Sequence, residues 1–109
     1  MKSPLSVRIT SSAAQAIEDA AKWWVTNRPK APDAFVIDLE NSLRLIASHP
    51  EIGARALNVK LESIRRLHLA RVHYHLYYRV TAEPAVEVLA LWHTSRRDSP
   101  NLELPQDLF

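Results

Sequence analysis

The chain has 109 residues and a formal net charge of +2, which suits one small domain and is too little charge to indicate nucleic-acid binding by itself. It has no cysteine and a single glycine, which excludes disulfides, thiolate chemistry and the glycine-rich loops that cradle nucleotides. It has no apolar run of ~18 residues that could span a membrane and no signal-peptide core in Met1–Ser6, so we expect a cytoplasmic protein.

The N-terminal third of the chain predicts a strand followed by a helix. Residues 5–10 alternate apolar and polar side chains, as a strand does. A helix is predicted from Ser12, where Gln15 completes a capping-box pattern, to about Thr26. The proline at the end of Asn27-Arg28-Pro29 breaks the helix there. The buried face of this first helix is predicted to contain Ile17, Ala20, Ala21 and Trp24.

A second amphipathic helix is predicted next. Pro32 suits a first helical turn, and Asp33 adds negative charge at the positive end of the helix. The apolar face of this helix contains Phe35, Leu39, Leu43 and Ile46. Pro50 and Gly53 end it, so the two helices should form an antiparallel hairpin. Residues 53–62 have weak periodicity and predict a loop or an irregular strand.

Three consecutive antiparallel strands are predicted over residues 64–69, 74–81 and 86–93. The last of them is the most apolar, so we place it inside the sheet rather than at an edge. The resulting β-α-α-β-β-β order predicts an α+β fold in which a helical hairpin packs on one face of an antiparallel sheet. The other face would then be free for function. We assign residues 1–98 to a single domain and residues 99–109 to a C-terminal tail.

Basic and aromatic side chains gather between Ile64 and Arg97. This stretch holds six arginines against two glutamates, four of the five histidines and all three tyrosines. Strand alternation predicts one polar face with Arg66 and His68 on the first strand and His75, Tyr77 and Arg79 on the second. Such a face can grip phosphate, since arginine offers a planar fork of donors. The alternative is a solvated strand face whose arginines pair with Glu87 or with the acidic tail.

His93 follows the last strand and is a candidate for acid–base chemistry. Its ordinary pKa lies near neutrality, so it can act as a general acid or base in RNA cleavage. Arg79 and Arg96 would then stabilise the charged phosphorane. The alternative is a histidine that only caps a strand end. His73 and His75 have no third ligand spaced to join them, so we expect neither a metal nor a cofactor.

Two adjacent tryptophans, Trp23 and Trp24, lie on the first predicted helix. Neighbouring helical residues point about 100° apart, so only one of them can face the core. The other should lie at the rim of the hairpin, where an exposed tryptophan is a good anchor for a partner. Alternatively, it packs under the turn at residues 27–32. The pattern does not decide which tryptophan is exposed.

An ordered set of residues along positions 7–98 resembles a known family. The set comprises Asn27-Arg28-Pro29, Ala34-Phe35, His49-Pro50, Gly53, Ile64-Arg65-Arg66-Leu67, Tyr74 to Val80, and Val88 to Arg96. It is similar to the RelE/ParE toxin superfamily, whose members have the same order of helices and strands. They are toxins of type II toxin–antitoxin modules.

The resemblance implies one of two activities. RelE-like members cut mRNA on the ribosome, typically with several basic residues plus a tyrosine or a His-Tyr pair near the C-terminus. ParE-like members inhibit DNA gyrase. This chain has no tyrosine after Tyr78, and its ending, Trp92 to Arg96, resembles the ParE branch. The resemblance therefore implies a gyrase-binding toxin. The alternatives are a ribosome-dependent endoribonuclease that uses His93, Arg66, Arg79 and Arg96, and an inactive module that only binds its antitoxin.

A ParD-like antitoxin is the partner that the resemblance implies, in a heterotetramer or larger complex. The residues expected to contact it are Trp23, Trp24, Arg65, Arg66, His68, Tyr77 and Arg79. The residues expected to contact the target are His93, Arg96 and Arg97. No cofactor and no membrane contact is expected, and nucleic acid is a partner only in the endoribonuclease alternative.

Overall fold

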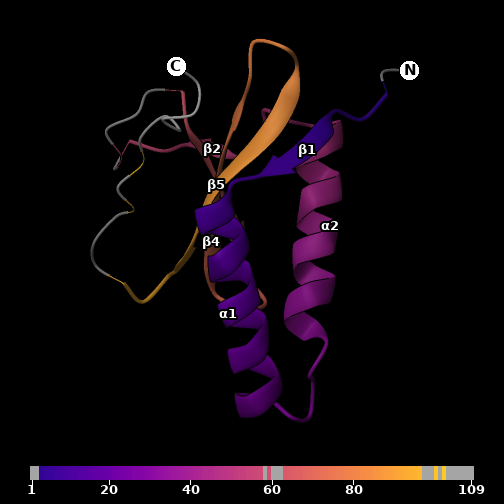
Figure 1. Ribbon diagram of the computed structural model, residues 1–109, viewed down its shortest axis with the longest axis vertical. Helices are drawn as coiled ribbons and strands as arrows, with labels where there is room; N and C mark the ends of the chain where they lie inside the picture. Colours follow the sequence, from indigo (N-terminus) through magenta and orange to yellow (C-terminus); the bar gives the residue numbers. More distant parts are fainter. Residues whose placement is uncertain (1–2, 58, 60–62, 97–99, 101, 103–109) are drawn as a thin grey trace.

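The computed structural model describes residues 3–57, 59, 63–96, 100 and 102. Two helices pack on a five-stranded sheet (Figure 1). The elements in chain order are β1 (Ser6–Ile9), α1 (Ser11–Asn27), α2 (Ala34–Ser48), β2 (Ala54–Arg55), β3 (Arg65–Leu69), β4 (Tyr74–Val80) and β5 (Ala85–His93). The predicted α+β class and element order are confirmed. The segment predicted as a loop or irregular strand contributes the two-residue strand β2.

The strand order in the sheet is β1-β5-β4-β3-β2. β5 lies between β1 and β4, as its apolar composition predicts. Strands β2 to β5 are antiparallel to their neighbours, but β1 runs parallel to β5, with Ser6 beside Ala85 and Ile9 beside Val88. The sheet is therefore mixed rather than wholly antiparallel. The pattern of a strand encodes neither its neighbour nor the relative direction of the two strands, so the parallel pairing of β1 with β5 is not visible in the sequence.

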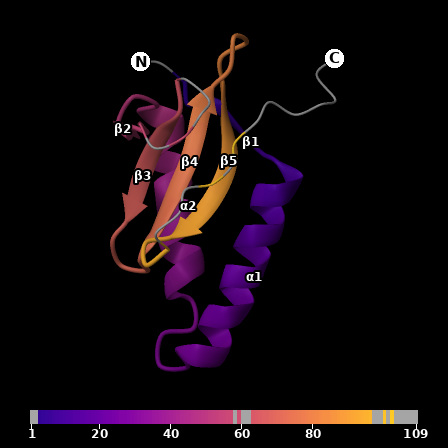
Figure 2. The same ribbon diagram turned by 90° about the vertical axis from the view of Figure 1, so that its left-hand side faces the viewer.

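The helical hairpin covers one face of the sheet, and its tip projects beyond the strands (Figures 1 and 2). On α2, Phe35, Leu39 and Ile46 are buried, and Leu43 packs against them, as the predicted apolar face requires. The buried residues that meet them from the sheet are Leu69, Leu76, Tyr78, Val86, Val88 and Leu91. This layer forms the main core and fixes which side chains of each strand point away from the helices.

The start of α1 differs from the prediction. The helix begins at Ser11, one residue before Ser12, and its N-cap is Thr10. The hydroxyl of Thr10 accepts the backbone N–H of Ala13 at 3.2 Å, while the Gln15 side chain donates to Asp19. A threonine fills the same capping role as serine. The predicted capping box is therefore replaced by a cap two residues earlier.

The face of the sheet away from the helices is partly covered. Ile64, Tyr77, Leu89 and Leu102 form a second buried cluster there. A β-bulge adds to it, because Tyr77 pairs with Ala90 and Tyr78 with Val88, which leaves Leu89 as an extra residue in β5. Leu102 is 8% exposed and caps this cluster from the predicted tail. The face is thus only partly free, contrary to the expectation of a wholly open face.

Among the described residues, no helix is long and apolar enough to cross a membrane.

Candidate functional site

The open part of the second sheet face carries a basic and aromatic cluster. Antiparallel pairing puts His68 directly beside His75, with ring centroids 5.1 Å apart, and His75 beside Trp92. Arg66 lies next along β3 on the same face, opposite Tyr77. Of the residues predicted for this polar face, Arg66, His68 and His75 lie together on its open part, whereas Tyr77 is buried and Arg79 is paired with Glu87. Such a surface suits an anionic partner.

The charge of this cluster acts on His75. Partial burial lowers the pKa of His75, and the nearby Arg66 and His68 lower it further. A neutral imidazole is therefore favoured at His75 near neutral pH. Arg66 gives the cluster a positive charge at that pH.

Arg79 is held in an ion pair rather than presented to solvent. Its Nε and one Nη each lie 2.8 Å from the same oxygen, Oε1 of Glu87, directly across on β5. Both side chains are largely buried, 19% and 14% exposed. This is the paired alternative that the sequence left open. The charge of Arg79 is thus largely compensated within the sheet.

Tyr77 and Trp24 are both buried, although both were expected to contact the antitoxin. Tyr77 is 1% exposed beneath Leu89 and Leu102. Trp24 is 9% exposed, and its Nε1 donates to the carbonyl of Ala31 at 2.8 Å, which ties α1 to the hairpin turn. Neither ring offers an accessible surface to a partner in this structure. The alternation of the strand identifies the face of Tyr77 but cannot show that the tail covers it.

Trp23 is the exposed tryptophan of the pair. Its side chain is 46% exposed near the C-terminal end of α1. The guanidinium of Arg28 lies 5.4 Å from its ring centroid, a cation–π distance. The hairpin therefore presents an aromatic ring with an adjacent positive charge.

His93 lies on the helix side of the sheet. It pairs with Tyr74 on β4, and the two rings meet edge to face at 5.0 Å. Its Nδ1 accepts the backbone N–H of Ser95 at 3.1 Å and lies 2.6 Å from the Ser95 hydroxyl. With Nδ1 accepting, the ring proton of neutral His93 belongs on Nε2. The imidazole thus organises the turn after β5.

Arg96 leaves this turn toward the opposite face. Its guanidinium stacks 3.6 Å from the centroid of Trp92, a residue of the second cluster. The third expected target contact, Arg97, lies outside the described residues. His93 and Arg96, the two described target residues, are therefore close in sequence, but their side chains pack on different sides of the sheet.

The four residues of the predicted endoribonuclease site do not come together. Arg66 and Arg79 lie on the face away from the helices, whereas His93 packs on Tyr74 on the helix side. General acid–base catalysis requires the proton-transferring group within hydrogen-bond reach of the reacting atoms that the cations stabilise. Here the sheet separates the proton-transferring candidate, His93, from the cationic candidates Arg66 and Arg79.

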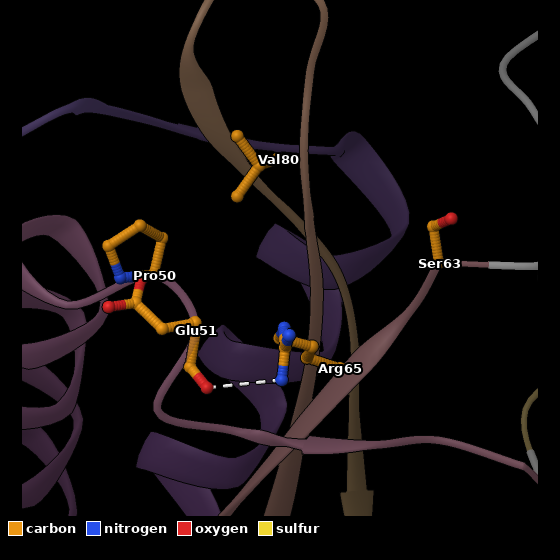
Figure 3. A pocket seen from close by; sticks show the side chains of 5 residues that line it. All are labelled: Pro50, Glu51, Ser63, Arg65 and Val80. Carbon is orange, nitrogen blue, oxygen red and sulfur yellow. Dashed lines mark hydrogen bonds between the residues drawn. The ribbon is translucent and has the colours of Figure 1, made fainter.

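A pocket of about 280 Å³ lies on the helix side, beyond the C-terminal end of α2 (Figure 3). Pro50, Glu51, Ser63, Arg65 and Val80 line it. Nη1 of Arg65 donates to the carbonyls of Glu51 at 3.0 Å and Gly53 at 2.7 Å. Of the five described residues that line this pocket, Arg65 alone belongs to the predicted site residues. The single glycine of the chain, Gly53, was the available signal that the backbone is crowded there.

Beneath the pocket, the Tyr78 hydroxyl donates to the carbonyl of Pro50 at 2.7 Å and accepts the N–H of Gly53 at 2.9 Å. Burial raises the pKa of Tyr78, while the bond from Gly53 and the charge of Arg65 oppose that shift. The phenol therefore stays protonated and acts as a structural tie. It fixes the loop that carries one wall of the pocket.

Among the described residues, no group of three or more histidines and carboxylates is placed to hold a metal ion. The histidine pair of the sheet face has Arg66 as its charged neighbour, which opposes a cation. No residue arrangement in this part of the chain suggests a cofactor site.

Two comparisons with known proteins give matches. Residues 7–98 match the family model described as ParE toxin of type II toxin-antitoxin system, parDE. The chromosomal ParDE toxin–antitoxin system from P. aeruginosa contains a chain of similar fold, with a TM-score of 0.69, 18% identity, and coverage of 84% of this chain and 97% of that one.

The toxin–antitoxin complex RelBE2 from Mycobacterium tuberculosis contains another, with a TM-score of 0.58, 22% identity, and coverage of 84% and 99%. At these identities the two structures support the fold. No relative matches among curated proteins. The family model spans most of the chain, and the fold agrees with it. The chain therefore belongs to the ParE toxin family of type II toxin–antitoxin systems.

Proposed function

We propose that this ParE-type toxin acts in the cytoplasm by binding and inhibiting DNA gyrase rather than by cutting RNA. The observation that carries the proposal is the separation of His93 from Arg66 and Arg79 by the sheet. An acid–base residue on the opposite side of the sheet from these two arginines is poorly placed to act with them in phosphodiester cleavage. A binding mechanism needs no such convergence.

The target surface in this proposal is the turn after β5. Its geometry is fixed by two contacts, the Ser95 bonds to His93 and the stacking of Arg96 on Trp92. A preorganised turn loses little conformational entropy on binding. Arg96 gives this surface positive charge.

A ParD-like antitoxin is the proposed neutralising partner, in a complex of four chains or more. The two solved structures of similar fold described above are from toxin–antitoxin systems, which supports such a partner. The members of the predicted contact set with accessible side chains are Trp23, Arg65, Arg66 and His68. They offer one aromatic anchor and several positive charges, which suit an acidic amphipathic segment.

The test is expression of the chain in cells with and without its antitoxin, while growth, the DNA-damage response and mRNA integrity are followed together. The proposal predicts growth arrest and DNA damage with intact mRNA, and relief by the antitoxin. Rapid mRNA cleavage would instead support the endoribonuclease alternative. Normal growth without the antitoxin would indicate an inactive interaction module.

His93→Gln and Arg96→Gln add residue-level information to this test. Glutamine at position 93 keeps a hydrogen-bonding side chain but removes acid–base chemistry. In the proposed mechanism both variants weaken toxicity without any change in RNA cleavage, because both alter the same binding turn.

A further inference from the structure

We propose that the pocket beside Arg65 receives an aspartate or glutamate side chain of the antitoxin. The proposal rests on the antitoxin partnership proposed above and deepens it, because it assigns a chemical group to a specific site. It is built from the contacts of Arg65, from the strand pairing beside it and from the walls of the pocket.

The guanidinium of Arg65 is fixed but only partly used. One nitrogen, Nη1, donates to the carbonyl of Glu51 (Figure 3) and also to the carbonyl of Gly53, and these two bonds hold the side chain beside the loop that follows α2. Among the described residues, Nε and Nη2 have no acceptor. No carboxylate within the described part of the chain forms an ion pair with Arg65. A positioned guanidinium edge therefore remains available for a bidentate carboxylate.

A second observation, the pairing of Arg65 with another arginine, also favours an anion at this site. Arg55 of β2 lies directly opposite Arg65 of β3 in the antiparallel ladder. Like charges in directly opposite positions destabilise a sheet. No carboxylate of the described residues forms an ion pair with either arginine, and the pocket opens beside Arg65. A carboxylate bound at Arg65 relieves the repulsion, so its binding gains more than one contact.

The walls of the pocket select one isolated carboxylate rather than a polyanion. Glu51 gives its main-chain carbonyl to Arg65 and is itself an acidic wall of the pocket, so a ligand must place one localised negative charge at the guanidinium edge rather than spread charge along the wall, as the closely spaced phosphates of a nucleic-acid backbone would. Pro50 and Val80 supply apolar surface against which the methylene groups of an acidic side chain can pack. At about 280 Å³, the pocket suits a side chain better than a cofactor.

Exposed aliphatic residues lie around this site. Val80 is 45% exposed, and Ile52, which precedes Gly53 in the loop after α2, is 48% exposed. Both offer apolar surface to the antitoxin residues on either side of the acidic residue that enters the pocket. The antitoxin segment that fits is therefore an acidic residue with aliphatic neighbours.

Arg65→Gln removes the charge, and Val80→Glu places a competing carboxylate in the pocket while the carbonyl bonds of Arg65 stay intact. The matched control for the second variant is Val80→Gln, which differs from it only in charge. Arg71→Gln, at an exposed arginine in the turn after β3, controls for overall charge. Binding of each variant to the antitoxin encoded with the toxin is measured by calorimetry. Thermal unfolding checks that each variant is folded.

We expect Arg65→Gln and Val80→Glu each to weaken binding about tenfold or more, which is the scale of one charge-assisted hydrogen-bond pair. Val80→Gln and Arg71→Gln should change it less than about threefold. Acidic residues of the antitoxin are then replaced by glutamine one at a time. One of them should show no further loss in the Arg65→Gln background, as a directly coupled pair requires.

The failure of this proposal differs from the failure of the proposed function. If the wild-type toxin binds the antitoxin and Arg65→Gln binds equally well, the pocket assignment is overturned while the partnership stands. If losses at Val80→Glu and Val80→Gln are equal, the effect is steric and the carboxylate assignment is overturned. If the wild-type toxin does not bind the antitoxin, both proposals fail together.

Discussion

The hydroxyl of Tyr78 occupies the space that a side chain at position 53 would need. A Cβ added to Gly53 would lie 2.6 Å from that oxygen and 2.9 Å from a ring carbon. The same oxygen bonds the backbone N–H of Gly53. The close approach explains why a glycine stands here, and it connects the end of α2 to the middle of the sheet.

Gly53→Ala should therefore lower the free energy of unfolding by about 1–3 kcal/mol, as overpacking does in a filled core. Tyr78→Phe should cost a similar amount, because it leaves the buried N–H of Gly53 without its partner. Urea unfolding measures both. In the double variant the lost hydroxyl gives the new methyl group room, so the combined cost should be less than the sum. Strict additivity would contradict the steric account.

The ion pair between Arg79 and Glu87 predicts an asymmetry between single and double variants. Glu87→Gln leaves a mostly buried guanidinium without its countercharge and should destabilise the protein by about 1–3 kcal/mol. Arg79→Met combined with Glu87→Leu should come closer to the wild-type stability, because an apolar pair replaces both charges. Equal losses in the single and double variants would show that the pair does not act as a unit.

Truncation should destabilise the protein far more at Trp24 than at Trp23. Trp24→Ala opens a cavity in the core and removes the bond to Ala31, so we expect a loss of about 3–5 kcal/mol of unfolding free energy. Trp23→Ala should cost less than about 1 kcal/mol, since its ring is half exposed. Acrylamide quenching separates them spectroscopically. Trp24→Phe should leave fluorescence that is quenched more readily than in Trp23→Phe.

His75 should make stability sensitive to mild acid. Its pKa is lowered in the folded state, so the unfolded chain binds the proton more readily. The stabilising contribution is complete above the unfolded pKa of about 6.5 and is lost as pH falls from there through the lowered folded value. Urea unfolding between pH 7.5 and pH 5 should therefore show a decline that His75→Gln reduces.

The control for this pH experiment is His49→Gln, at an exposed histidine after α2. That variant should keep the wild-type pH dependence. If His75→Gln leaves the decline unchanged, the acid sensitivity lies elsewhere, and the charges of Arg66 and His68 do not act on this ring as described.

Much of the fold could be read from the sequence, because local periodicity reports which side of an element is buried. The spacing of Phe35, Leu39 and Ile46 predicts the α2 face, and the apolar run before His93 predicts that β5 lies inside the sheet rather than at an edge. The parallel pairing of β1 could not be read. Which strand lies beside β1 depends on contacts nearly 80 residues away.

The functional residues were harder to predict for the same reason. Alternation places Tyr77 on the polar face, yet Leu102, far along the chain, buries it. The arginines are visible in the sequence, but their partners are not. Arg79 meets Glu87 across a strand, while Arg65 bonds to main-chain carbonyls, which carry no sequence signal.

The central claim, that this ParE-type toxin inhibits gyrase by binding it, is tested most directly by supercoiling of relaxed plasmid with purified gyrase and purified toxin. The account predicts that the toxin blocks supercoiling or traps cleaved DNA in a dose-dependent way, and that Arg96→Gln weakens the effect. Full gyrase activity at saturating toxin, together with cleavage of ribosome-bound mRNA by the same preparation, would contradict it.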